Sequence, residues 1–146
     1  MKFVVFACLM VLLVAQHHLP VQCKKMNIEE LKGFSKPLTK SCKTKTGISE
    51  VILAQVAKRE FADDPVLKCY FKCIAQMGKM MDKKGNLILE NMLKQVELLI
   101  IEELSPRVKK VFTQCFEEMT VKEPCQLAFD FIMCIERTDQ ELNIIV

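Results

Sequence analysis

Six cysteines constrain this chain more than any other feature of its sequence. The intervals between them are 26, 3, 41, 9 and 8 residues, and an apolar leader precedes them. An even number of cysteines in a short exported domain indicates a disulfide framework. The sequence therefore predicts an oxidised domain that is held together by three disulfides. The six residues are Cys42, Cys69, Cys73, Cys115, Cys125 and Cys134.

The leader has the organisation of a signal peptide. Lys2 gives a positive charge, and Phe3 to Val14 form an apolar run of 12 residues, which is too short to span a bilayer. Cleavage after Cys23 leaves six cysteines, whereas cleavage at Ala15 leaves seven, and an odd cysteine in an exported domain would need a separate explanation. We therefore expect a cleaved signal peptide at 1–23 and a secreted, extracellular protein.

The expected mature chain, residues 24–146, has the length of a single domain. It carries 20 basic and 18 acidic residues, a net charge of +2, which does not indicate a nucleic-acid ligand. Both histidines, His17 and His18, lie in the leader, so the domain lacks the side chain that nucleophile–base pairs and many metal sites use. We expect no enzyme activity, no catalytic residue, no cofactor and no metal, and no stable membrane insertion.

Apolar residues recur at helical spacing throughout the domain, and no alternating strand pattern interrupts them. Helix start signals divide this pattern into six segments, so we expect an all-α fold. Pro37 lies within the first segment and should bend it or divide it in two. The predicted helices run from Asn27 to about Lys45, from Ser49 to before Asp63, from Asp64 through Met77, from Ile88 to Ile100, from Ser105 through Met119, and from Glu123 to about Arg137.

The sixth predicted helix is apolar on almost all sides, which places it at the centre of the fold with the other five around it. Beyond it, the tail at 138–146 begins with polar residues and ends with apolar ones. This tail is either a lid on a cavity or a disordered end. Leu142, Ile144 and Ile145 favour a lid.

Helix geometry restricts which cysteines can pair. Cys69 and Cys73 are four residues apart on one helix, so their side chains point the same way and should reach different elements. Cys125 and Cys134 are nine residues apart and face opposite ways. Excluding these two pairs reduces the fifteen possible pairings to ten, and the geometry does not select among the ten.

The cysteine spacing resembles that of the insect odorant-binding proteins, which include the pheromone-binding proteins. The resemblance covers the whole mature chain and rests on the three residues between the second and third cysteines and the eight between the last two. Thr46-Gly47 and the turn at Lys84-Gly85-Asn86 agree with it. The resemblance implies six helices around an apolar cavity, and an interlocked set of bridges. These bridges are Cys42–Cys73, Cys69–Cys125 and Cys115–Cys134.

The same resemblance implies a carrier that binds small hydrophobic molecules, of odorant or pheromone type, and carries them through aqueous fluid. It also implies an olfactory receptor complex as a partner, and a monomer or weak homodimer. We expect the apolar faces of the predicted helices and the tail to line the cavity, although core packing is an equal alternative for Met80, Met81 and Met92. The candidate ligand-binding residues are Leu38, Met77, Met80, Met81, Met92, Val96, Leu99, Val111, Phe112, Phe131, Ile135, Ile144 and Ile145.

Three alternatives keep part of this pattern. The same fold could sequester a signalling molecule in a gland or in saliva, and sequence does not separate these roles. A saposin-like membrane-perturbing protein is also helical and has six cysteines, but its disulfides clasp the two chain ends, whereas Cys69 and Cys73 lie in the middle of this chain. A secreted phospholipase needs a histidine base, which the mature chain lacks.

Overall fold

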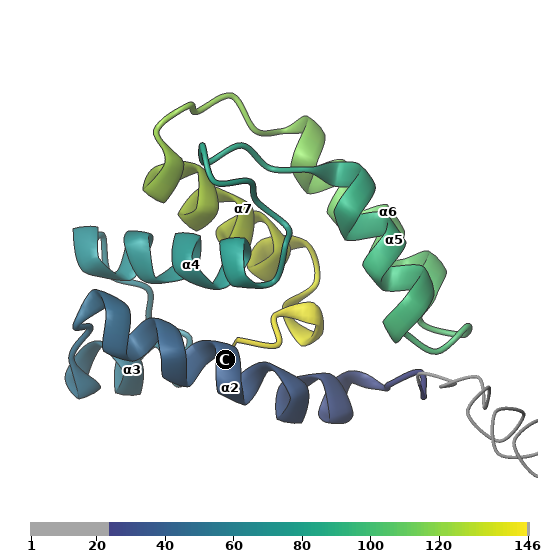
Figure 1. The fold of residues 1–146 in the computed structure, drawn as a ribbon, viewed down its shortest axis with the longest axis horizontal. Coiled ribbons are helices and arrows are strands. Elements are labelled where there is room, and N and C mark those ends of the chain that lie inside the picture. The colour runs from purple at the N-terminus through teal and green to yellow at the C-terminus, as the bar shows by residue number, and fades with distance from the viewer. Residues whose placement is uncertain (1–23, 146) are drawn as a thin grey trace, which may run out of the picture.

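The computed structural model describes residues 24–145, so the predicted signal peptide at 1–23 lies outside the described residues. Within this part of the chain the fold is all-α, as predicted, with six α-helices and one short 3₁₀ helix (Figure 1). No helix in it is both long enough and apolar enough to cross a membrane. The elements are α2 (Ile28–Thr46), α3 (Glu50–Val56), α4 (Pro65–Met77), α5 (Leu89–Leu99), α6 (Ser105–Glu117), α7 (Pro124–Thr138) and η1 (Gln140–Leu142).

Polar caps begin four of the helices at the predicted positions. The side chains of Asn27, Ser49, Asp64 and Glu123 accept hydrogen bonds from backbone N–H groups in the first turns of α2, α3, α4 and α7. The N–H groups at the start of α7 also hold the pKa of the Glu123 carboxyl below its usual range. Gly47, with a left-handed φ of 67°, ends α2 as the Thr46-Gly47 signal predicts.

Two helix details differ from the prediction. α2 is one helix through Pro37, so the proline does not divide it in two. α4 packs along this helix and a disulfide joins the two. Ser105 is the first residue of α6 rather than its cap, and Leu104 occupies the cap position without a side-chain hydrogen bond. The Ser105 backbone N–H already donates to the carbonyl of Ile101, so the preceding turn leads directly into the helix.

The centre of the fold is shared by two helices rather than occupied by α7 alone. α4 and α7 pack together more extensively than any other pair, α2 packs against α4, and α6 packs against both α5 and α7. In Figure 1 the α4–α7 pair therefore lies between α2 along one side and the α5–α6 pair along another. The core between them contains Leu67, Phe71, Ala128 and Phe131, each at most 2% exposed.

Apolar residues on α3 and α4 are divided between the core and the surface. On α4, Leu67 and Phe71 fill the core, whereas Val66 is exposed. On α3, Val56 is buried, whereas Val51 is 69% exposed. Periodicity identifies these helices correctly, but an apolar residue at the edge of a stripe can lie on either side of the boundary.

Three disulfides join the helices in a linear order. Cys42 of α2 is bonded to Cys73 of α4, Cys69 of α4 to Cys125 of α7, and Cys115 of α6 to Cys134 of α7. These are the pairs that the family resemblance implies. None of the three clasps the two ends of the chain, which the saposin-like alternative requires.

Two contacts hold α5 and the turn before it: one lies at the C-terminal end of α5, and the other lies in the turn between α4 and α5. Met26, which precedes the cap residue of α2, lies beside Ile100 at the end of α5 and forms backbone hydrogen bonds with Leu99 and Ile101. In the turn between α4 and α5, Gly85 has a φ of 93° and lies so close to Pro124 that a Cβ atom there would approach the proline ring to 2.4 Å. The turn therefore rests directly on the first turn of α7, and only glycine leaves room for this contact.

Candidate ligand-binding cavity

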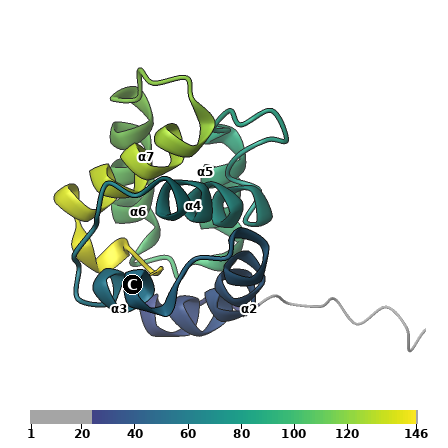
Figure 2. The same cartoon turned by 90° about the vertical axis from the view of Figure 1, so that its left-hand side faces the viewer.

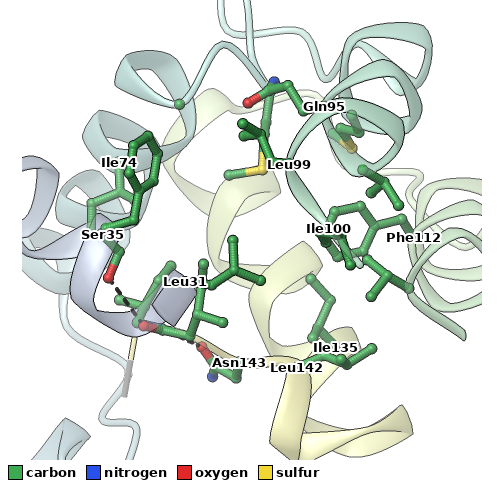
Figure 3. A pocket seen from close by; sticks show the side chains of 18 of the residues that line it. Leu31, Ser35, Ile74, Gln95, Leu99, Ile100, Phe112, Ile135, Leu142 and Asn143 are labelled. Atoms are coloured by element: carbon green, nitrogen blue, oxygen red, sulfur yellow. Dashed lines mark hydrogen bonds between the residues drawn. The ribbon is translucent and has the colours of Figure 1, made fainter. Parts of the chain in front are cut away.

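The helices enclose a cavity of about 440 Å³, a volume within the usual range for small-molecule sites. It is bounded by α2, the C-terminal end of α4, α5, α6, α7 and the tail (Figure 3). Apolar side chains make up most of its wall, and Lys79 is the only charged residue that lines it among those the structure describes. The other polar side chains in the wall are those of Ser35, Gln95 and Asn143.

An aromatic pair forms part of this wall. Phe112 from α6 and Phe131 from α7 meet edge to face, with ring centroids 6.0 Å apart. Phe131 is almost fully buried between α4 and α6, so its ring is held by the core on one side and borders the cavity on the other. An aromatic pair fixed in this way gives an apolar ligand a rigid surface to pack against.

Most of the predicted lining residues border this cavity in the structure. They come from α2, the end of α4, α5, α6, α7 and the tail. They are Leu38, Met77, Met80, Met92, Val96, Leu99, Phe112, Phe131, Ile135, Ile144 and Ile145.

Two predicted lining residues, Met81 and Val111, do not border this cavity. Met81 is 3% exposed and lies in the core, where its backbone bridges to Leu87, so its side chain points away from the cavity that Met80 borders. Val111 is also buried in the core. It directly precedes Phe112, and one residue along an α-helix turns the side chain by about 100°. Both residues pack inside the protein without reaching the cavity wall.

Several residues of the wall are not among the predicted ones. Leu31 and Ile74 lie at helical spacing from Leu38 and Met77, so the sequence contains a signal for both. The polar members gave no such signal, because a polar residue beside an apolar stripe usually faces solvent. Leu142, which was predicted to be part of a lid, also borders the cavity. The remaining residues of the wall that were not predicted are Ile28, Phe34, Ser35, Gly78, Lys79, Gln95, Leu98, Ile100, Leu104, Val108, Ile132 and Asn143.

The C-terminal tail closes one side of the cavity. After α7 the chain turns through η1 and runs back toward α2 (Figures 1 and 2). Leu142 and Asn143 are buried, Ile144 and Ile145 border the cavity, and the Ser35 hydroxyl of α2 is 3.3 Å from the carbonyl oxygen of Ile144, to which it donates. The tail thus occupies the position of a wall in this structure.

Ion pairs from two other elements hold the tail in place. Arg107 of α6 donates two hydrogen bonds to the Asp139 carboxylate, at 2.5 and 2.7 Å, and one to Glu141 at 2.7 Å. These three residues are called the tail latch below. The hydrogen bonds from the two carboxylates raise the pKa of the Arg107 guanidinium above its ordinary value.

A second group of polar contacts lies at the other edge of the tail. Arg59 of the α3–α4 connection donates to Glu136 Oε1 at 2.5 Å and to the carbonyl oxygen of Gln140 at 3.2 Å. Asn143 Nδ2 donates to the other oxygen of the same Glu136 carboxylate at 2.8 Å. Because Asn143 is 2% exposed, these contacts satisfy an amide that would otherwise be costly to bury.

We expect ligand affinity to change by less than about twofold between pH 7.5 and 6, and to fall only at more acid pH. The pKa of Arg107 is raised in the folded protein, so its positive charge stabilises the fold fully at every pH below the pKa of the unfolded chain. Arg107 therefore stays protonated and paired between pH 7.5 and 6. Residues 24–145 contain no histidine, the side chain whose unperturbed titration lies near pH 6.5, so no imidazole changes its charge beside the tail over this range.

Titrating a fluorescent ligand against the protein at a series of pH values measures this dependence. The variant with Asp139→Asn and Glu141→Gln is the control, because it removes the carboxylates that pair with Arg107 in the tail latch and should likewise show no change of affinity between pH 7.5 and 6. A sharp loss of affinity centred near pH 6.5 would contradict this account.

The residues described by the structure contain no cluster of side chains suited to a metal ion. The cavity offers burial of apolar surface and a few hydrogen-bonding groups, which is the chemistry of binding. Its apolar wall, built by five helices and the tail, is suited to holding a molecule of low solubility in water.

Comparison with known proteins agrees with this architecture. The family model described as "PBP/GOBP family" matches residues 24–138. Odorant binding protein 5 of Apis mellifera is similar in structure, with a TM-score of 0.70 and 25% identity over 81% of this chain and 96% of that chain. Odorant binding protein 4 of Chrysopa pallens has a TM-score of 0.68 and 23% identity, over 80% of this chain and 96% of that one. An odorant-binding protein of Locusta migratoria has a TM-score of 0.66 and 22% identity, over 86% and 91%.

Proposed function

We propose that this chain, which belongs to the PBP/GOBP family, is a secreted carrier that binds small hydrophobic molecules in its internal cavity and carries them through aqueous fluid. The cavity of about 440 Å³ with its apolar wall is the observation that carries the proposal. The predicted signal peptide supports secretion. An odorant or pheromone as the ligand, and an olfactory receptor complex as its destination, rest on the family alone.

The energetics of such binding come mainly from the burial of ligand surface. Removing apolar surface from water contributes roughly 25 cal/mol per Å². Part of this gain is offset by the loss of translational and conformational freedom on binding. A ligand of roughly ten to sixteen carbons is therefore expected to bind with a free energy of about −8 kcal/mol, a micromolar affinity.

We expect the protein to increase the fluorescence of a hydrophobic naphthylamine probe, and long-chain alcohols, esters or aldehydes to displace that probe. Met80→Trp should narrow the cavity, because Met80 lies in its wall, and should shift preference toward shorter ligands by roughly tenfold. Competition with a series of chain lengths measures the shift, and thermal unfolding shows whether the fold is retained.

Met119→Trp is the matched control, because Met119 is partly buried against the core but does not border the cavity. It should leave the preference for chain length unchanged. The carrier proposal fails if the native protein never increases probe fluorescence. A Met80→Trp protein that keeps the native preference would mean that the probe binds elsewhere.

A further inference from the structure

We propose that Gln95 and Lys79 form a polar subsite at one end of the cavity, where they bind the terminal oxygen group of a long-chain ligand, with a carboxylate preferred. This inference rests on the proposed function, because it assigns the ligand class and orientation within the same cavity. Gln95 lies on α5, and Lys79 lies in the connection between α4 and α5. We call this pair the polar subsite.

The polar groups at the tail side of the cavity are already engaged within the protein. The Ser35 hydroxyl lies 2.9 Å from the carbonyl oxygen of Lys32 and 3.3 Å from that of Ile144, and can donate to either. Asn143 Nδ2 donates to the Glu136 carboxylate, and Asn143 Oδ1 accepts from the backbone N–H of Ile145. A ligand would have to compete with these bonds, so this side offers little to its polar group.

Gln95 differs from these residues. Among the described residues its carboxamide has one hydrogen bond, in which Nε2 donates to the carbonyl oxygen of Asn91 over 3.4 Å, well beyond the usual length. Gln95 lies three residues after Met92 and four before Leu99, so it belongs to the same apolar stripe of α5. Figure 3 shows its carboxamide across the cavity from the tail residue Asn143.

A weakly paired amide at an apolar wall gains from a ligand that supplies a partner. The carboxamide can donate through Nε2 or accept through Oε1, so it can bind a carboxylate, a hydroxyl or a carbonyl oxygen. A pure hydrocarbon has no hydrogen-bonding group. When it displaces water from the cavity, the Gln95 carboxamide loses the water and gains no new hydrogen bond. Gln95 should therefore discriminate between ligands of equal length that differ only in their terminal group.

Lys79 gives the subsite its preference for an anion. It is the only charged residue in the cavity wall among those described, it makes no ion pair with them, and no carboxylate lines the cavity. Asn91 Nδ2 donates to the backbone carbonyl oxygen of Lys79 at 3.2 Å, which places the Lys79 backbone beside the turn of α5 that leads to Gln95. Lys79 is exposed, and its flexible side chain would have to turn toward this end of the cavity to pair with a bound carboxylate, which meets no opposing charge from the wall.

The rest of the wall determines the orientation of the ligand. From Gln95 the cavity extends past Leu99 toward Phe112 and Ile135, which are apolar (Figure 3). A carboxyl group in that region would lose its hydration without gaining a hydrogen bond. The hydrocarbon chain therefore occupies the α6–α7 side, and the terminal oxygen group lies at the polar subsite.

The test compares four ligands with twelve carbons, namely the carboxylic acid, the alcohol, the methyl ester and the alkane, in competition with a fluorescent probe at pH 7.5. In the native protein we expect the acid to bind more tightly than the alcohol, and the alcohol more tightly than the alkane. Gln95→Leu should weaken the acid and the alcohol by about five- to tenfold and leave the alkane unchanged. Lys79→Met should weaken the acid alone, by about threefold.

Two further variants make the result specific. Gln95→Glu keeps the size of the side chain and adds a negative charge, so it should weaken the acid more than the alcohol. Gln114→Leu changes an exposed glutamine of α6 that does not border the cavity, so it is the matched control and should leave the ratio of acid to alkane affinity unchanged. Equal affinities of acid and alkane in the native protein, or an equal loss of both in Gln95→Leu, would overturn the polar subsite. Failure of all four ligands and the probe to bind would instead overturn the proposed function.

Discussion

Loss of the Cys69–Cys125 bridge is expected to lower the free energy of unfolding by about 4 kcal/mol. The two cysteines are 56 residues apart, and the chain-entropy model gives about 4.2 kcal/mol for a closed loop of that length. The bridge also joins α4 to the first turn of α7, the pair of helices that forms the centre of the fold. Replacing both cysteines by alanine avoids an unpaired thiol, and chemical denaturation of the double variant measures the loss.

The double variant Cys115→Ala and Cys134→Ala is the comparison for this experiment. These cysteines are 19 residues apart, for which the same model gives about 3.2 kcal/mol, and they join α6 to α7 at the other end of that helix. Peptide mapping without reduction should show the two remaining native bridges in each variant. A loss below about 1 kcal/mol for Cys69 and Cys125 would show that this bridge does not stabilise the central pair of helices.

Deletion of residues 143–146 is expected to speed the exit of a bound ligand by roughly 30-fold while the helices remain folded. The deletion removes Ile144 and Ile145 from the cavity wall together with the hydrogen bond from the Ser35 hydroxyl. Loss of two partly buried side chains corresponds to about 2 kcal/mol, and every 1.4 kcal/mol changes a rate or affinity tenfold. Stopped-flow displacement of a fluorescent ligand measures exit, and circular dichroism measures helix content.

A variant with Ile144→Ala and Ile145→Ala separates the contribution of the side chains from that of the backbone. It keeps the chain, the tail latch and the carbonyl oxygen that accepts from Ser35, so its exit rate should lie between those of the native and truncated proteins. An exit rate in the truncated protein equal to that of the native one would contradict the role of the tail as a lid. Unfolding of the truncated protein would show instead that the tail belongs to the core.

The helix starts could be predicted because their causes are local. The side chains of Asn27, Ser49, Asp64 and Glu123 accept from backbone N–H groups two or three residues away, so a few letters of sequence contain the whole interaction. Ser105 shows where this fails, since it is the first residue of α6 and its own N–H donates to a carbonyl of the preceding turn. The cysteine pairing needed the resemblance to a family, because helix geometry alone left ten possibilities.

The cavity wall could be predicted only in part because a helix in a small domain has two apolar directions. One direction meets the neighbouring helix and the other meets the cavity, and hydrophobic periodicity treats both as buried. Met81 and Val111 lie in the core for this reason, although their neighbours Met80 and Phe112 border the cavity. Gln95 was missed for the opposite reason, since its polarity concealed its place on the apolar stripe of α5.

The disulfides link some of the helices that form the cavity wall to one another and leave α5 unlinked. The three bonds connect α2 to α4, α4 to α7 and α7 to α6, so these four helices form one covalently continuous scaffold. α5 contains no cysteine and is held by packing against α6 and by the backbone hydrogen bonds between Met26 and the end of the helix. It nevertheless supplies Met92, Gln95 and Leu99 to the wall. We therefore expect the cavity to accommodate ligands of different size by displacement of α5, while the four disulfide-linked helices stay in place.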